Sequence, residues 1–504
     1  KEIHAVPAVS AGAVELNSVV ITSRSGNKRV KSRSNAPSRG SRLGLDMPAN
    51  EEEVAQIGLL TAGEINDFGK WNMWDDVAKG DLDIYRARWQ MYPAKRYCAI
   101  VQNDMGAPVP DANVEMLDEA GRAIWTARTD NTGKAELWSN FFMGEEQDKP
   151  ASLVVTMGNL MAKKNDVVSI EKGVNAITIG AACGISDQVD IMFAVDATAS
   201  MGDEIEYLKM ELTDIINQVS SSRPELSIRT GSLFYKCPGN SYVTKPQSFT
   251  SDIATTVNFI SQQSASEGGD EVVEQAMLEA VNQFEWSSEA RARLLFMVLD
   301  EPPGLNSNVI PDLQLAIKEA AKKGIRIIPL VSSGVTYEID KSLEYLMRCV
   351  ALGTNGSYTF LTNHSGIGNP HTAPSTDSYD VEKLNGMLIR LIDQYTYFPD
   401  CPAPEIAQTA TPVESDTTLA EAGEGKRKWQ MELFPNPARF EINIRSEKSM
   451  DEIHILDMSG KLIYRFALAE ELFNLQLESL TNGNYIARCR TGEEWTSLKF
   501  VVSK

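Results

Sequence analysis

Short apolar runs separated by helical stretches occupy residues 186–398. The runs VDIMFAVD, ARLLFMVLD and GIRIIPLVSS are almost continuously apolar, which is typical of strands buried on both faces of a parallel sheet. One intervening segment places apolar residues at helical spacing along a single face: Ile205, Leu208, Leu212, Ile215, Ile216 and Val219. The pattern predicts a doubly wound, Rossmann-like α/β domain, which we place at residues 183–401.

Two other regions alternate apolar and polar residues, as half-buried strands do. Residues 95–182 contain ANVEMLD, AIWTART and AELWSN, separated by the turn sequences GAPVPD, EAGR and DNTGK. Residues 431–504 alternate in the same way, for example at Leu498, Phe500 and Val502. We expect a β-sandwich from each region. The predicted fold is therefore multi-domain, with a central α/β domain flanked by two sandwiches.

Three segments lack such patterns. Residues 1–50 are rich in Ser, Arg, Lys and Gly around positions 23–44 and predict a disordered tether. Residues 51–94 carry three tryptophans and are expected to pack on the sandwich that follows. Residues 402–430 are rich in Pro, Thr, Ala and Glu and predict a linker.

Charge and hydropathy narrow the range of functions. The formal net charge of -21 argues against nucleic acid as a partner, because phosphate binding needs surplus Lys and Arg. No apolar run reaches the about 18 residues that a membrane helix needs. The first residues do not read as a signal peptide, so the chain is either cytosolic or already processed. Six cysteines without a Cys-x-x-Cys pair, and only four histidines, disfavour a zinc site.

Oxygen-bearing side chains follow the predicted strands. Asp196, Thr198 and Ser200 come directly after one strand, and Asp300 ends another. Asp270 follows two glycines just before an amphipathic helix. Ligands of doubly wound sheets gather at the carboxyl ends of the strands, and hard cations prefer oxygen ligands. We predict a metal site from these five residues. The other reading of DATAS is a helix N-cap, because Asp, Thr and Ser are favoured there.

These residues resemble the metal-ion-dependent adhesion site of von Willebrand factor type A (vWA) domains, in a bacterial and hemicentin-like branch. The resemblance rests on FAVDATASMGDEI, LFYK, SASEGGDEVVE and ARLLFMVLDEPPG. It implies Mg²⁺, or alternatively Mn²⁺ or Ca²⁺, and a protein partner that offers a carboxylate to the ion. Gly269 stands where integrin-type domains have Thr, so Asp270 would add a second anionic ligand and weaken the attraction for that carboxylate.

The remaining resemblances concern the flanking regions and the cysteines. Residues 95–182 resemble carboxypeptidase-regulatory-like, prealbumin-type sandwiches, which are Ig-like spacers. Cys183 and Cys401 bracket the α/β domain, whose termini should lie close together, so we predict a disulfide between them. Two free buried thiols are the alternative.

The last residues resemble the C-terminal sorting domain of the type IX secretion system. The matching positions are Pro435, Asn436, Pro437, Asp457, Ser459, Gly460, Lys461, Gly483 and Tyr485. The resemblance implies export across the outer membrane to the cell surface or the medium, after removal of a signal peptide. Oxidising conditions there would permit the disulfide.

The function predicted from the sequence is cell adhesion or another metal-dependent protein interaction at the cell surface. An accessory or structural component of the secretion apparatus or surface layer is the alternative. We expect no enzyme, because Ser200 has no histidine in a recognisable arrangement and no Gly-rich phosphate loop is present.

Overall fold

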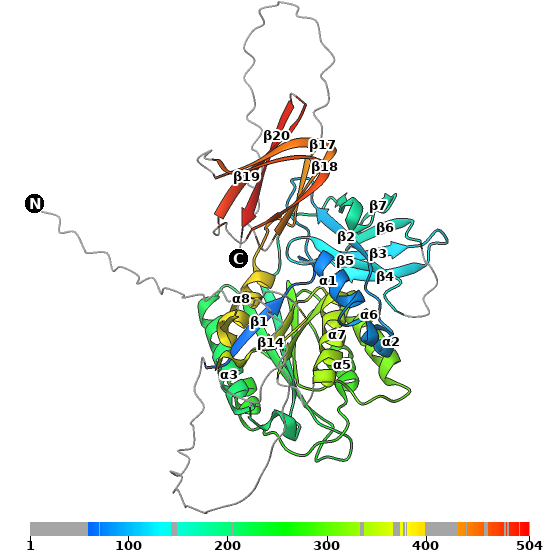
Figure 1. The fold of residues 1–504 in the computed structure, drawn as a ribbon. Helices are drawn as coiled ribbons and strands as arrows, with labels where there is room; N and C mark the ends of the chain where they lie inside the picture. Colours follow the sequence, from blue (N-terminus) through cyan, green and yellow to red (C-terminus); the bar gives the residue numbers. More distant parts are fainter. Residues whose placement is uncertain are drawn as a thin grey trace, which may run out of the picture.

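A computed structural model describes most of the chain. It covers residues 59–502, except for 70, 143–148, 204, 333–336, 366–372, 376–378, 380, 399–430, 440, 458–461, 478–479, 481–482 and 493. The described chain is a multi-domain, mixed α/β protein with several sheets (Figure 1). The predicted tether at 1–50 and the predicted linker at 402–430 lie outside the described residues.

The largest sheet has eight strands in the order β11-β10-β9-β12-β13-β14-β1-β15. Five neighbouring strands run parallel: β9 (Gln188–Asp196), β10 (Ser227–Tyr235), β12 (Ala292–Leu299), β13 (Ile325–Val331) and β14 (Tyr358–Leu361). Antiparallel strands complete the two edges: β11 (Thr244–Thr250) on one, and β1 (Thr61–Ile65) and β15 (Val381–Lys383) on the other. Every residue of β12 and β13 is buried, as the continuous apolar runs predict.

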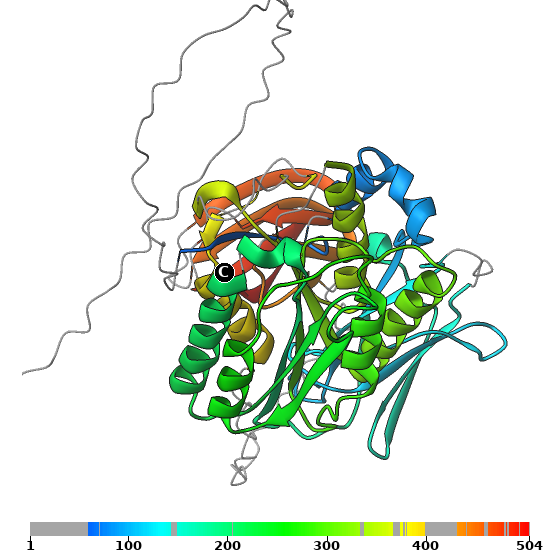
Figure 2. The same cartoon turned by 90° about the horizontal axis from the view of Figure 1, so that it is seen from below.

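Helices cover both faces of this sheet (Figure 2). One face packs against α3 (Ile205–Ser222), α4 (Ile253–Ser261) and α8 (Leu384–Thr396). The other packs against α5 (Val273–Asn282), α6 (Val309–Lys323) and α7 (Tyr337–Gly353). The inward residues of α3 include Leu208, Leu212 and Ile215, all at most 1% exposed. Because the parallel strands share one direction, their carboxyl ends meet at one edge of the sheet.

The described part of segment 51–94 packs on the unit that follows, where the Trp71 and Trp138 rings lie 5.5 Å apart, and it also extends into the α/β region. Strand β1 enters the eight-stranded sheet, where Ile65 pairs with Tyr358 of β14. Helices α1 (Trp71–Lys79) and α2 (Asp83–Trp89) then lie against α7. The Trp89 indole donates to the Ser342 carbonyl at 3.0 Å. The short strand TAGEI has too few apolar residues to show a strand period, so its place in the sheet is invisible in the sequence.

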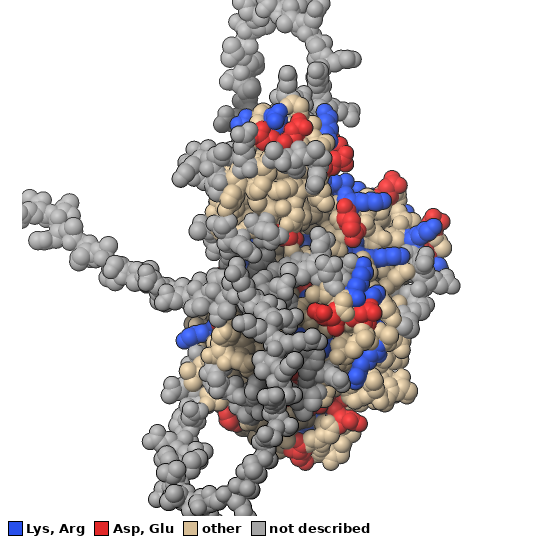
Figure 3. All heavy atoms as spheres, viewed as in Figure 1, with Lys and Arg blue, Asp and Glu red and all other residues tan. Residues whose placement is uncertain are grey.

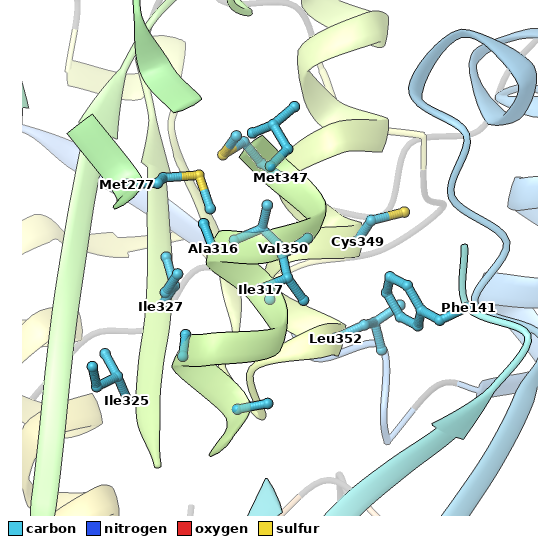
Figure 4. Close-up of a cluster of buried hydrophobic side chains, with 14 of the residues drawn as sticks. Phe141, Met277, Ala316, Ile317, Ile325, Ile327, Met347, Cys349, Val350 and Leu352 are labelled. Atoms are coloured by element: carbon cyan, nitrogen blue, oxygen red, sulfur yellow. The ribbon is translucent and has the colours of Figure 1, made fainter. Parts of the chain in front are cut away.

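Residues 95–178 form two further sheets. The first joins β5 (Lys134–Ser139), β2 (Lys95–Gln102) and β8 (Asn175–Thr178), and the second joins β4 (Ala123–Arg128), β3 (Asn113–Leu117), β6 (Ser152–Met157) and β7 (Leu160–Asn165). We call this the two-sheet unit. Its core continues into the α/β region, because Phe141 lies beside Leu352, the residue before Gly353 (Figure 4).

The C-terminal sheet is antiparallel and separate from the others. It contains β16 (Met431–Phe434), β17 (Glu441–Asp457), β18 (Leu462–Gln476), β19 (Gly483–Thr491) and β20 (Glu494–Val502). Its own core includes Ile442, Ile444, Ala487 and Phe500. None of the described helices has the length and apolar character needed to cross a membrane.

Candidate metal centre

Three carboxylates meet at the carboxyl edge of the eight-stranded sheet. Asp196 is the last residue of β9, Asp300 directly follows β12, and Glu271 precedes α5. Each offers one oxygen, and the three oxygens all lie within 4.8 Å of one another. The residues are 0%, 1% and 5% exposed, respectively. Burying three like charges together is costly unless protons or a cation neutralise them.

Two hydroxyl groups adjoin this carboxylate cluster. The backbone N–H of Thr198 donates to Asp196 Oδ1 at 2.7 Å, which turns the chain immediately after β9. The Thr198 and Ser200 hydroxyl oxygens lie 2.8 Å apart, and Thr198 Oγ1 donates to Glu271 Oε1 at 3.4 Å. The loop is held by the loop before α5, since Ala199 N–H donates to the Glu267 carbonyl at 2.7 Å. This hydrogen bond joins the loop after β9 to the loop before α5 beside the carboxylate cluster.

Burial and mutual repulsion raise the pKa values of the carboxyl groups in and beside this cluster. Burial, together with the carboxylates of Asp196 and Asp300, raises the pKa of Glu271 well above its usual value. Burial also raises the pKa of Asp196. The Glu301 pKa is raised by burial and by the Asp196 charge. The charge of the Lys236 ammonium favours ionised Asp196, but it does not outweigh the effect of burial on the Asp196 pKa. The same ammonium donates to Ser266 Oγ at 2.5 Å.

The cluster has fewer donors than its oxygens require. Asp196 Oδ2 and Glu271 Oε2 are buried, and no N–H or hydroxyl group within the described part of the chain donates to either oxygen. The Asp196 and Glu271 carboxyl groups can hydrogen-bond each other only when one of them is protonated. Buried polar atoms are almost always satisfied in native proteins. Carboxylate and hydroxyl oxygens are the ligands that Mg²⁺, Mn²⁺ and Ca²⁺ prefer. The residues present therefore fit a divalent cation chemically.

Asp270, the fifth predicted ligand, is not among the three clustered carboxylates. Asp270 is exposed and lies against Gly304, where an added Cβ would come within 2.6 Å of the Asp270 Cβ. Glu271 stands beside Asp196 in its place. The backbone turns at Gly269, whose φ of +144° is rarely adopted by other residues. The backbone conformation at this turn determines which of the two consecutive carboxylates, Asp270 or Glu271, faces inward. The hydrophobic pattern of the sequence does not predict this conformation.

The other predicted site residues lie elsewhere. Cys183 is disulfide-bonded, while Cys401, its predicted partner, lies outside the described residues. The described cysteines Cys98, Cys237, Cys349 and Cys489 are buried free thiols.

The predicted sorting residues are distributed over the C-terminal sheet. The Val501 N–H donates to Asn436 Oδ1 at 2.8 Å, which ties the segment Pro435 to Pro437 to β20. Asp457 pairs in register with Tyr485, and Gly483 begins β19. Ser459, Gly460 and Lys461 lie outside the described residues.

Residues 432–503 match the family model described as a secretion system C-terminal sorting domain. This domain indicates export by the type IX secretion system and a secreted or cell-surface location. The match covers only the C-terminal sheet. A search of curated proteins found no significant match to the chain.

Several solved structures are distantly similar. An aerotolerance-related membrane protein from Bacteroides fragilis is 14% identical with a TM-score of 0.29, over 41% of this chain and 98% of that one. PorZ, a surface component of the type IX secretion system of Porphyromonas gingivalis, is 16% identical with a TM-score of 0.14, over 15% and 11%. Proximal thread matrix protein 1 from the mussel byssus is 13% identical with a TM-score of 0.24, over 35% and 49%. With TM-scores this low, the similarities assign neither a fold family nor a function to this chain.

Proposed function

We propose that the exported chain binds a protein partner through a divalent cation held in a vWA-type domain at residues 183–401. The observation that carries this proposal is the buried carboxylate cluster with its unsatisfied oxygens on Asp196 and Glu271. Support also comes from its position, because ligand sites of doubly wound sheets lie beyond the carboxyl ends of the parallel strands.

The proposed ion ligands are Asp196, Thr198, Ser200, Glu271 and Asp300, some of them through water. Mg²⁺ is the first candidate, and Mn²⁺ and Ca²⁺ are alternatives that accept the same oxygen donors. When bound, the cation would supply a positive centre to which a partner's oxygen can add. The protein's part is to hold the oxygens together, through the turn at Thr198 and the contact of Ala199 with the loop before α5.

The proposed partner offers a carboxylate, as the vWA resemblance implies. Three protein carboxylates already exceed the charge of a divalent cation, so a fourth would meet net repulsion if all were ionised. We expect Glu271 to be the group that yields, because it comes from the loop before α5 rather than from the end of a strand, as Asp196 and Asp300 do. Partner binding should then be weak until Glu271 moves away.

Calorimetric titration of Mg²⁺, Mn²⁺ and Ca²⁺ into the EDTA-treated full chain tests the proposal. We expect about one ion per chain, and at least a tenfold loss of affinity in Asp196→Asn, which removes one charge with little change of shape. Asp118→Asn, on an exposed turn of the two-sheet unit, is the control. Ion binding of equal affinity in wild type and Asp196→Asn would refute the proposed site.

A further inference from the structure

The sorting domain, residues 431–504, lies against the rest of the described chain, which we call the body (Figure 1). Phe434, at the end of β16, is 7% exposed and shares a buried apolar cluster with Cys98 and Val174 of the two-sheet unit. Ile100, Ile170 and Leu472 pack around them. This cluster is separate from the main cores, so the Val174 side chain is shielded from solvent by Phe434 rather than by a core of the body.

Charged contacts flank the apolar cluster. Arg439 of the sorting domain pairs with Glu64 of β1 at 3.2 Å, and Arg439 also contacts Gln394 of α8. Glu64 is 4% exposed on its side chain and pairs with Arg390 of α8 at 3.0 Å as well. The buried Glu64 carboxylate thus lies between one cation from the body and one from the sorting domain.

The body's face is assembled from three parts of the chain. Glu64 comes from the N-terminal strand β1, Val174 from the two-sheet unit and Gln394 from α8. Arg445 of the sorting domain also contacts this face. Its guanidinium lies so close to Gly173 of the two-sheet unit that a Cβ at Gly173 would overlap it. A face of this kind exists only when all three parts have folded together.

The contact is not packed like a domain core. A cleft of about 800 Å³ remains between the two sides, lined by Pro435 and Pro437 of the sorting domain and by Trp71 and Asn131 of the body. A contact made of a small apolar cluster and ion pairs around an open cleft is typical of separable domains. Figure 3 shows acidic and basic groups interspersed on the viewed surface.

We propose that the body carries a specific docking face for its own sorting domain, and that the two remain bound after the chain between them is cut. Glu64, Ile100, Ile170, Val174 and Gln394 form the face, and Phe434 and Arg439 occupy it. The docked sorting domain keeps this apolar surface covered, and its release exposes the surface on the exported body. The proposal is independent of the metal site.

The test uses the full chain with a protease recognition sequence inserted within residues 405–425. After cleavage, gel filtration should show body and sorting domain eluting together, and titration of separated fragments should restore the complex. Val174→Asp should weaken the affinity at least about tenfold, because docking would bury an unpaired carboxylate. Glu64→Gln should weaken it less, since the amide keeps a hydrogen bond to Arg439.

Met161→Asp, at an exposed position on β7 of the same unit, is the matched control. Circular dichroism of each fragment shows that it stays folded after cleavage. Co-elution in wild type and Met161→Asp with separation in Val174→Asp supports the docking face. Separation of the wild-type fragments, or equal affinity in Val174→Asp, overturns it.

Discussion

Asp270 and Glu271 are neighbours in the chain, but their carboxylates lie in different surroundings. Asp270 is exposed against Gly304, whereas Glu271 is buried beside Asp196. Burial, together with the charges of Asp196 and Asp300, raises the Glu271 pKa well above its usual value. Perturbed, clustered carboxylates of this kind are typical of functional sites.

A second buried carboxylate shows the opposite behaviour and yields a prediction about pH. Burial raises the pKa of Glu136, but the charges of Arg96 and Lys134 outweigh it and lower the pKa below 4.5. The stabilisation is therefore present above about pH 4.5 and is lost as the pH falls through the lowered pKa. Glu136→Gln should cost roughly 3–5 kcal/mol of unfolding free energy at pH 7, because Arg96 loses its buried partner.

Urea unfolding at several pH values measures this effect. The difference between wild type and Glu136→Gln should shrink as the medium is acidified. The pair of Asp83 and Arg86, in which the Asp83 side chain is 56% exposed, provides the control, for which Asp83→Asn should change little. A difference that is the same at all pH values would contradict the assigned role of Glu136.

The residues of the metal site are partly readable from the sequence. Asp196, Thr198, Ser200 and Asp300 are identified because each follows a strongly apolar strand, and strand ends are fixed by the apolar pattern. Glu271 cannot be identified in this way, because its orientation depends on the backbone at Gly269 and on packing against the Gly304 loop. Such choices between adjacent residues are made by tertiary contacts.

At the scale of elements, the edge strand β1 is the part of the sheet that the sequence pattern does not indicate. The parallel strands and their covering helices follow from apolar runs and helical spacing. Strand β1 carries only five residues, one of them Gly63, and pairs with β14 almost 300 positions later. A strand so short has no pattern of its own, and it is specified by the edge that it completes.

Close packing at this edge gives a paired prediction. A Cβ on Gly63 would come within 2.6 Å of Phe360 Cζ, so Gly63→Ala should destabilise the α/β region by roughly 1–3 kcal/mol. Gly386, in α8, has open space around it, so Gly386→Ala should stabilise by about 0.5–1 kcal/mol. Thermal unfolding of both variants measures the contrast, and shifts of the same sign would count against the assigned packing of β1.

At the scale of the whole molecule, the α/β region depends on its neighbours. Strand β1 completes its sheet, and Phe141 extends its core into the two-sheet unit (Figure 4). The sorting domain is a separate sheet with its own core, joined to the body by a smaller contact. The metal site should therefore be studied in the intact chain, because residues 183–401 alone lack part of the fold that positions it.

The most direct test of the central claim compares two adjacent carboxylates in the intact protein. Calorimetric titration of Mg²⁺ or Mn²⁺ should show at least a tenfold loss of affinity for Glu271→Gln, which removes a charge from the carboxylate cluster. Asp270→Asn should bind the ion nearly as wild type does, because Asp270 lies outside the cluster. Loss of affinity in Asp270→Asn with none in Glu271→Gln, or no ion binding to the wild type, would contradict the account.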